Sequence, residues 1–220
     1  MTTRKPYADD SLLGRLSDRG VNALSDVELL AVVAGAPNPT QVDTFRRMIS
    51  EAGSLQAVVY AEEGTGGEGM SEAQRVRVSA AIELSRRCLY EELAQRPSLG
   101  NPRDSGDYLR ARLRHLPYEV FACLFLDNRH RVLAFAELFR GTIDGASVHP
   151  REVVREALKV NAAAVIFSHN HPSGVAEPSA ADRAITHELR DALQLVGVRV
   201  LDHLVIGSGE PVSMAARGLM

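Results

Sequence analysis

The chain carries, at residues 162–174, the run Ala162-Ala163-Ala164-Val165-Ile166-Phe167-Ser168-His169-Asn170-His171-Pro172-Ser173-Gly174. The first six residues of this run are apolar, which predicts a buried β-strand. The proline and glycine after the second histidine predict a turn. Because side chains two positions apart on an extended strand point to the same side, His169 and His171 can converge on one ion while Asn170 faces away.

Asp182 follows this pair in the sequence and completes a ligand set suited to a divalent metal. Two imidazoles and a carboxylate can hold zinc and leave the fourth tetrahedral position to water. Ser179 and Asp182 also fit the start of a helix, with Ser179 as N-cap and Asp182 closing a capping box. A helix that begins there and returns over the strand end would bring Asp182 to the imidazoles, so capping and metal binding can coexist.

A zinc-activated water also needs a base that takes its proton and later hands it to the leaving group. Glu137 lies in an apolar, strand-like run, where period-two alternation places it on the same face as Phe135 and Phe139. A carboxylate buried there is costly unless a metal and its water lie beside it. Glu152 competes for the role, but it follows Pro150 in a predicted first helical turn, where an acid complements the helix dipole. We therefore predict Glu137 as the general acid/base.

The other histidines are predicted to lie outside this site. His149, at an expected helix start, is either an N-cap or a substrate contact. His203 lies in a strand-like segment, residues 198–206, and is predicted to be a structural histidine. Three more have no partner at ligand spacing and are expected to be solvated: His115, His130 and His187.

Two other zinc chemistries are excluded by missing motifs. A nucleobase deaminase needs His-x-Glu together with Pro-Cys-x-x-Cys, and a helical zincin needs His-Glu-x-x-His; neither pattern occurs in this chain. Cys88 and Cys123 cannot supply a four-thiolate metal site and are too few for a disulfide framework. Their small number predicts a reducing compartment.

The composition predicts a two-part protein without a membrane span. The chain has 220 residues, of which 45% are hydrophobic, enough for two modest cores. No apolar stretch is long enough to cross a bilayer. The first ten residues also lack the apolar segment of a signal peptide, so we expect a cytoplasmic location.

The order of the elements predicts a helical domain at residues 1–97, a linker at 98–104 and an α/β domain at 105–220. In the first part, Ser25 and Glu28 form a capping-box pattern, and residues 64–69 are a glycine-rich break. Alternating strands and helices in the second part predict a mixed sheet. The expected helices are 25–35, 41–53, 54–61, 71–92, 105–113, 150–160 and 179–195, and the expected strands are 119–127, 132–139, 164–168 and 198–206.

The spacing of His169, His171, Ser179 and Asp182 resembles the JAMM/MPN metallopeptidase pattern: His-x-His, seven residues, Ser, two residues, Asp. The resemblance narrows to RadC-family proteins on four strings and extends over nearly the whole chain from about Leu12. These strings are Phe139-Arg140-Gly141-Thr142, Val148-His149-Pro150-Arg151-Glu152-Val153, His169-Asn170-His171-Pro172-Ser173-Gly174 and Leu201-Asp202-His203-Leu204.

The resemblance implies a JAMM/MPN α/β domain, with a layer similar to that of cytidine deaminases, behind a small helix-hairpin-helix-like domain. It implies Zn²⁺ held by His169, His171 and Asp182, and a catalytic glutamate on a strand ahead of the His pair, the position of Glu137. It gives the Ser179 position a role in polarising the substrate carbonyl or stabilising its oxyanion. The implied reaction is hydrolysis of a peptide or isopeptide bond in a peptide or protein substrate.

The alternative is a DNA-repair-associated adaptor with a structural or vestigial metal site. Helix-hairpin-helix turns usually present a Gly-hydrophobic-Gly sequence to phosphate, but the corresponding stretch here is Gly69-Met70-Ser71-Glu72, in which serine replaces the second glycine and an acid follows. Residues 1–97 hold 11 Lys and Arg against 14 Asp and Glu, whereas DNA binding draws on basic clusters. The sequence therefore favours the hydrolase.

Overall fold

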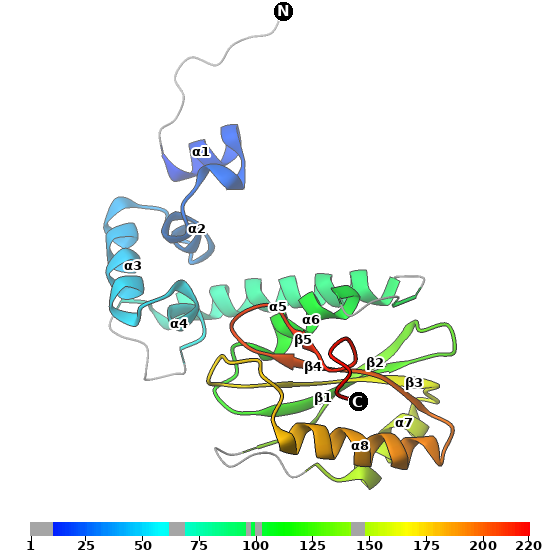
Figure 1. Cartoon of the computed structure of the whole chain (residues 1–220). Helices are drawn as coiled ribbons and strands as arrows, with labels where there is room; N and C mark the ends of the chain where they lie inside the picture. The colour runs from blue at the N-terminus through cyan, green and yellow to red at the C-terminus, as the bar shows by residue number, and fades with distance from the viewer. Residues whose placement is uncertain (1–10, 62–68, 96–97, 100–102, 142–147) are drawn as a thin grey trace, which may run out of the picture. The chain divides into compact units, whose positions relative to one another are not determined.

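The structure, a computed structural model, describes residues 11–61, 69–95, 98–99, 103–141 and 148–220 (Figure 1). The chain divides into two compact units, Met1–Ser85 and Arg86–Met220. Among the described residues, no helix has both the length and the apolar character needed to cross a membrane.

The first unit is helical, as predicted. Its core surrounds Ala31, Ala34 and Phe45, all fully buried. Local signals fix the helix starts: Ser25 and Glu28 form the predicted capping box, and Asn38 caps a helix whose first residue is Pro39. Except for Gly69, the predicted glycine-rich break lies outside the described residues. The elements are α1 (Leu12–Arg19), η1 (Val21–Ala23), α2 (Asp26–Val33), α3 (Pro39–Ala52), α4 (Leu55–Val59) and α5 (Glu72–Gln95).

The division between the units falls within α5, earlier in the chain than the boundary predicted near residue 100. Leu89, Tyr90 and Leu93 follow one another at helical spacing in the last turns of α5 and pack into the core of the second unit, as does Leu99. Burial of these side chains ties the end of the helix to the second unit. The predicted linker at 98–104 lies in part outside the described residues.

The second unit is built on a five-stranded mixed sheet, which confirms the predicted α/β class. The strands are β1 (Val120–Leu126), β2 (Val132–Arg140), β3 (Ala164–Asn170), β4 (Arg199–Ile206) and β5 (Val212–Ser213), in the order β2-β1-β3-β4-β5. β3 and β4 are parallel, and the other neighbouring pairs are antiparallel. The short β5 was not predicted, because two residues carry no alternation pattern.

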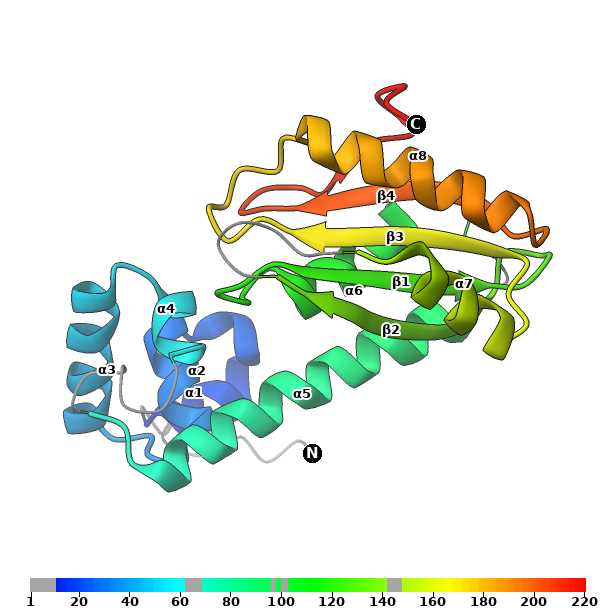
Figure 2. The ribbon, with the colours of Figure 1, turned by 90° about the horizontal axis from the view of Figure 1, so that it is seen from below.

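Helices cover both faces of this sheet, which explains why β1 and β3 are buried along their whole length. α6 (Arg103–Leu113) and the end of α5 pack on one face, and α7 (Pro150–Lys159) and α8 (Ala180–Gln194) pack on the other (Figures 1 and 2). Successive side chains of β3 therefore enter different cores, with Ile166 on the α6 face and Phe167 on the α8 face.

Candidate metal centre

His169 lies near the end of β3, and His171 is the first residue after that strand. The chain leaves the strand in a turn that is fastened to the end of β4: the His171 amide donates to the Ile206 carbonyl at 2.9 Å, and the Ser208 amide donates to the Gly174 carbonyl at 2.8 Å. Gly174 has a φ of +83°, and a Cβ there would lie 2.3 Å from the Ser208 hydroxyl. The positive φ favours glycine at this position, and the turn that it allows holds the second histidine in place.

Asp182 comes from the first turn of α8 and closes the predicted capping box with Ser179. The Ser179 hydroxyl accepts from the Asp182 amide at 3.1 Å and donates to Asp182 Oδ2 at 2.6 Å, while the Ser179 amide donates to the same oxygen at 2.7 Å. The capping box fixes the carboxylate relative to the helix start. The cap thus also orients the carboxylate toward the two histidines.

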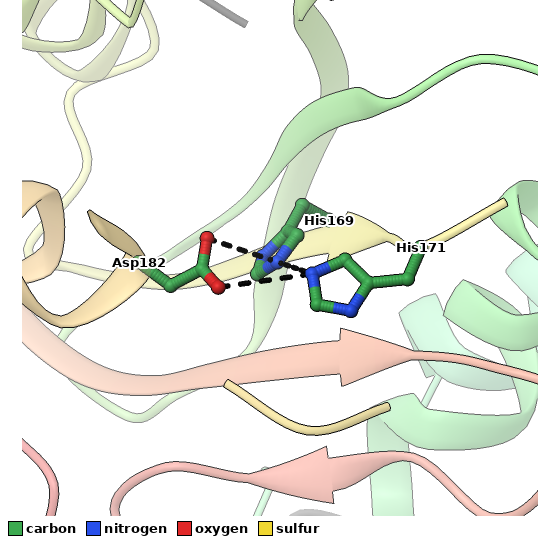
Figure 3. A group of neighbouring side chains, drawn as sticks. All are labelled: His169, His171 and Asp182. Atoms are coloured by element: carbon green, nitrogen blue, oxygen red, sulfur yellow. Dashed lines mark hydrogen bonds and ion pairs between the residues drawn. The ribbon is translucent and has the colours of Figure 1, made fainter. Parts of the chain in front are cut away.

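The three predicted ligands converge, although they come from two elements (Figure 3). The Nε2 atoms of His169 and His171 are 2.9 Å apart. Asp182 Oδ1 lies 3.3 Å from His169 Nε2, and its Oδ2 lies 3.7 Å from His171 Nε2. One ligand atom from each residue falls within 4.8 Å of the others, so the group has the reach to hold a metal ion.

The electrostatics of the group suit a cation. Burial alone would raise the pKa of the Asp182 carboxyl, but the adjacent imidazoles of His169 and His171 outweigh it and hold that pKa well below its ordinary value. The neighbouring Asp182 side chain raises the pKa of His171, against the effect of burial. The carboxylate therefore stays ionised, and its negative charge attracts a cation.

Hydrogen bonds on the far side of each ring leave the Nε2 atoms directed to the shared point. His171 Nδ1 lies 2.7 Å from the Val175 carbonyl, to which it can only donate. His169 Nδ1 lies 2.8 Å from Nε2 of His203. Metal-binding histidines in proteins usually have such a partner on the second nitrogen. Two imidazoles and one carboxylate, held this way, fit a divalent metal such as zinc.

The group opens into a cavity of about 1100 Å³ in the second unit. His169, His171, Asp182 and Ser179 contribute to its wall, together with apolar side chains and Glu119. A cavity that combines apolar walls with a few converging polar groups is typical of a ligand site. The four predicted residues other than Glu137 thus line one cavity.

Glu137 does not join them, and its predicted placement beside the imidazoles is wrong. Its carboxylate accepts a hydrogen bond from Arg112 of α6 at 2.8 Å, on the face of the sheet opposite to the one on which α8 packs. The β1–β2 register explains the error, since Phe121 pairs with Phe139 whereas Ala122 pairs with Glu137. The extra residue, Leu138, is a bulge that breaks the alternation.

Glu119 is the acidic residue that the sequence reasoning missed. It immediately precedes β1 and is half-buried in the cavity wall. Its charge also contributes to the raised pKa of His171. Alternation backwards from Phe121, whose ring lies in the core on the α8 face, would place Glu119 on that same face. The sequence signal for Glu119 is therefore its position two residues before Phe121, at the start of the strand predicted over 119–127.

Three of the remaining predictions on side chains are also decided. Glu152 pairs with Arg155 at the start of α7, in agreement with its structural interpretation. His149 occupies the N-cap position of α7, but its side chain makes no capping hydrogen bond. Its ring packs edge-on against the ring of Phe139, with the two ring centroids 6.0 Å apart. His203, predicted to lie outside the site, is fully buried and lines the cavity.

The three histidines expected to be solvated differ from one another. His187 is exposed on α8, as predicted. His130 is half-buried, and its Nε2 lies 3.2 Å from Nη2 of Arg199. His115 contacts Arg86 at 2.8 Å, and burial, followed by the charges of Arg86 and Arg112, lowers its pKa to about 4. His115 is therefore a neutral, packed side chain, contrary to the prediction.

Residues 99–219 match the family model described as RadC-like JAB domain. UPF0758 proteins from Thioalkalivibrio sulfidiphilus and Stutzerimonas stutzeri are 54% and 53% identical to this chain, and the alignments cover 97% and 100% of both partners, respectively. A UPF0758 protein from Alcanivorax borkumensis is 55% identical over 93% of each chain. The similarity thus includes the helical unit as well as the α/β unit.

Proposed function

Because the chain belongs to the family of RadC-like JAB-domain proteins, we propose that it is a zinc-dependent hydrolase that cleaves a peptide or isopeptide bond. The observation that carries the proposal is the convergence of His169, His171 and Asp182 in a cavity that Glu119 also lines. A zinc ion held by these three residues would supply Lewis-acid activation of a water molecule and of the substrate carbonyl.

Glu119 takes the place of Glu137 as the proposed general acid/base. A carboxylate at the cavity wall can accept the proton released when water attacks the carbonyl and can deliver it to the departing amine. Glu137 is unsuited to this task, because Arg112 holds it on the other face of the sheet. The proposed reaction type is unchanged. Only the residue that carries the proton differs, Glu119 in place of Glu137.

Ser179 is the proposed donor to the substrate oxygen. Its hydroxyl lies at the cavity wall and donates to Asp182 Oδ2 at 2.6 Å. Rotation about its side chain would redirect the hydroxyl proton to a carbonyl oxygen bound in the cavity, where negative charge develops during attack. The amide of Ser179 would continue to hold Asp182 while the hydroxyl turns.

The Gly69-Met70-Ser71-Glu72 turn is poorly suited to bind DNA phosphate. The turn that would present amides to phosphate contains Ser71, whose amide already donates to the Gln74 side chain at 2.8 Å. Glu72 adds a negative charge at the same helix start. The free thiols Cys88 and Cys123 support our further proposal that the enzyme works in a reducing compartment, the cytoplasm.

The test combines metal analysis with turnover of a panel of peptides and lysine-linked isopeptides. We expect about one equivalent of zinc in the wild type, Glu119→Gln and Glu137→Gln. The Glu119→Gln variant should lose activity by about 10²–10⁴-fold, the usual contribution of a general acid/base. Glu137→Gln is the matched control, since it makes the same chemical change on the other face of the sheet, and it should retain activity.

Two results would overturn the proposal. Full activity in Glu119→Gln would remove this residue from the mechanism. A wild-type protein that binds zinc but hydrolyses no member of the panel would contradict the peptidase assignment, whatever the behaviour of the variants.

A further inference from the structure

Two fully buried polar side chains, His203 of β4 and Thr186 of α8, connect two of the metal ligands to each other. His203 Nε2 lies 2.8 Å from Nδ1 of His169, and His203 Nδ1 lies 2.6 Å from the Thr186 hydroxyl. That hydroxyl in turn donates to the backbone carbonyl of Asp182. A continuous hydrogen-bond chain therefore runs from a ligand on β3, through β4, to a ligand on α8.

The proton positions in this chain follow from its last member. A threonine hydroxyl has one proton, and a backbone carbonyl can only accept, so the Thr186 proton points to Asp182. The Thr186 oxygen must then accept from His203 Nδ1–H. His203 Nε2 is left without a proton and accepts from His169 Nδ1–H. His169 consequently keeps its proton on Nδ1 and presents a bare Nε2 to the point shared with His171 and Asp182.

The opposite arrangement would disable the ligand. If Thr186 donated to His203, then His203 would donate to His169 Nδ1, and His169 would carry its proton on Nε2. A protonated Nε2 cannot bind a metal ion. The carbonyl of Asp182, by accepting the hydrogen bond from Thr186, therefore selects the tautomer of His169 in which Nε2 is free to bind.

We propose that His203 and Thr186 are positioning residues that fix the tautomer and ring orientation of His169 and fasten Asp182 to the same sheet. This inference rests on the metal site of the proposed function and adds two residues that never touch the ion. Second partners of metal-binding histidines typically contribute 10- to 100-fold to metal affinity. We expect loss of this series of hydrogen bonds to weaken zinc binding by that factor.

Packing alone does not account for these two residues. The rings of Phe121 and Phe167 meet the His203 ring edge-on, with ring centroids 5.5 Å and 5.8 Å from its centroid. An aromatic hydrocarbon side chain would therefore fill the same space. Burying an imidazole and a hydroxyl there is costly unless every polar atom is paired. The hydrogen bonds that compensate this cost are those that link His203 and Thr186 to the ligands His169 and Asp182.

The experiment uses two substitutions that remove the hydrogen bonds and two that keep them. His203→Phe retains the aromatic packing, and Thr186→Val retains the shape of the side chain. Both substitutions break the series of hydrogen bonds between His169 and Asp182. His203→Gln offers an acceptor to His169 and a donor to Thr186, and Thr186→Ser keeps the hydroxyl. Zinc affinity of the full-length proteins is measured by competition with a chromophoric chelator, and imidazole tautomers by long-range ¹H–¹⁵N NMR.

We expect His203→Phe and Thr186→Val to raise the Kd for zinc about 10- to 100-fold, and His203→Gln and Thr186→Ser to retain most of the affinity. In the wild type, the NMR spectrum should show His203 and His169 protonated on Nδ1. Equal zinc affinity in all variants would overturn the proposal. So would a wild-type His203 protonated on Nε2, which can be observed even if His203→Phe fails to fold.

These outcomes are separate from those that test the hydrolase. Zinc binding that depends on His203 and Thr186, without turnover of any substrate, would overturn the proposed function and leave this inference standing. A wild-type protein without measurable zinc affinity would overturn both.

Discussion

Asn170 stands between His169 and His171 in the sequence and is fully buried. Its side-chain oxygen accepts from the Val120 amide at 2.8 Å, and its side-chain nitrogen donates to the Tyr118 carbonyl at 2.9 Å. These two partners are the neighbours of Glu119 on either side. Asn170 therefore holds the proposed general base in register with the ligands, although 50 positions separate it from Val120.

We expect Asn170→Ala to lower the free energy of unfolding by about 1–3 kcal/mol, because the Val120 amide loses its acceptor in a buried place. Urea denaturation measures the loss. Asn128→Ala is the control, since Asn128 is an exposed turn residue and its replacement should change stability by no more than about 0.5 kcal/mol. Equal stability of the two variants would contradict a structural role for the Asn170 amide.

The sequence could predict that His169, His171 and Asp182 converge, because their spacing is local, but it could not predict these long-range contacts. Alternation on one strand is enough to turn His169 and His171 to one side and Asn170 to the other. The partners of Asn170 and His203 lie on other strands and helices, and their identity depends on the sheet order. His203 looked like an ordinary strand residue for this reason.

The helix starts show the same contrast among whole elements. Both capping boxes, at α2 and at α8, are contained within four residues, so the sequence predicted them correctly. The face of β2 that carries Glu137 depends instead on a bulge opposite β1. One extra residue in a strand reverses the side to which all later side chains point. Register of this kind is set by pairing and not by the strand's own pattern.

The capping box of α2 makes the stability of the first unit depend on pH. The Ser25 amide, the Arg15 side chain and the Ser25 hydroxyl all donate to Glu28, and together they lower its pKa to about 2 from the usual 4.5. A carboxyl with a depressed pKa in the folded state stabilises that state above pH 4.5. The contribution is lost progressively as the pH falls toward 2.

We expect Glu28→Gln to be less stable than the wild type by about 1 kcal/mol at pH 7, since glutamine keeps a capping acceptor but loses the charge next to Arg15. The difference should shrink as the pH is lowered from 4.5 toward 2. Urea denaturation at several pH values provides the measurement. Glu51→Gln, an exposed site on α3, is the control, and a difference that stayed constant with pH would refute the role given to Glu28.

At the level of the whole molecule, all three ligands, the cavity and the hydrogen-bond chain belong to the unit Arg86–Met220. The ion would join the end of β3 to the start of α8, two elements that meet otherwise through the core on the α8 face. A ligand that binds only the folded state stabilises it by mass action. Zinc should therefore stabilise this unit in particular.

The two cysteines allow this to be measured. Cys123 lies fully buried on β1, and burial raises the pKa of its thiol well above the ordinary value, so it reacts only when the sheet opens. With free zinc at 100 times Kd, the folded state gains about 2.7 kcal/mol, and alkylation of Cys123 followed by mass spectrometry should slow about 100-fold. Cys88 is exposed and should react at the same rate with and without zinc. If Cys123 is alkylated equally fast in both conditions, the ion does not bridge β3 and α8.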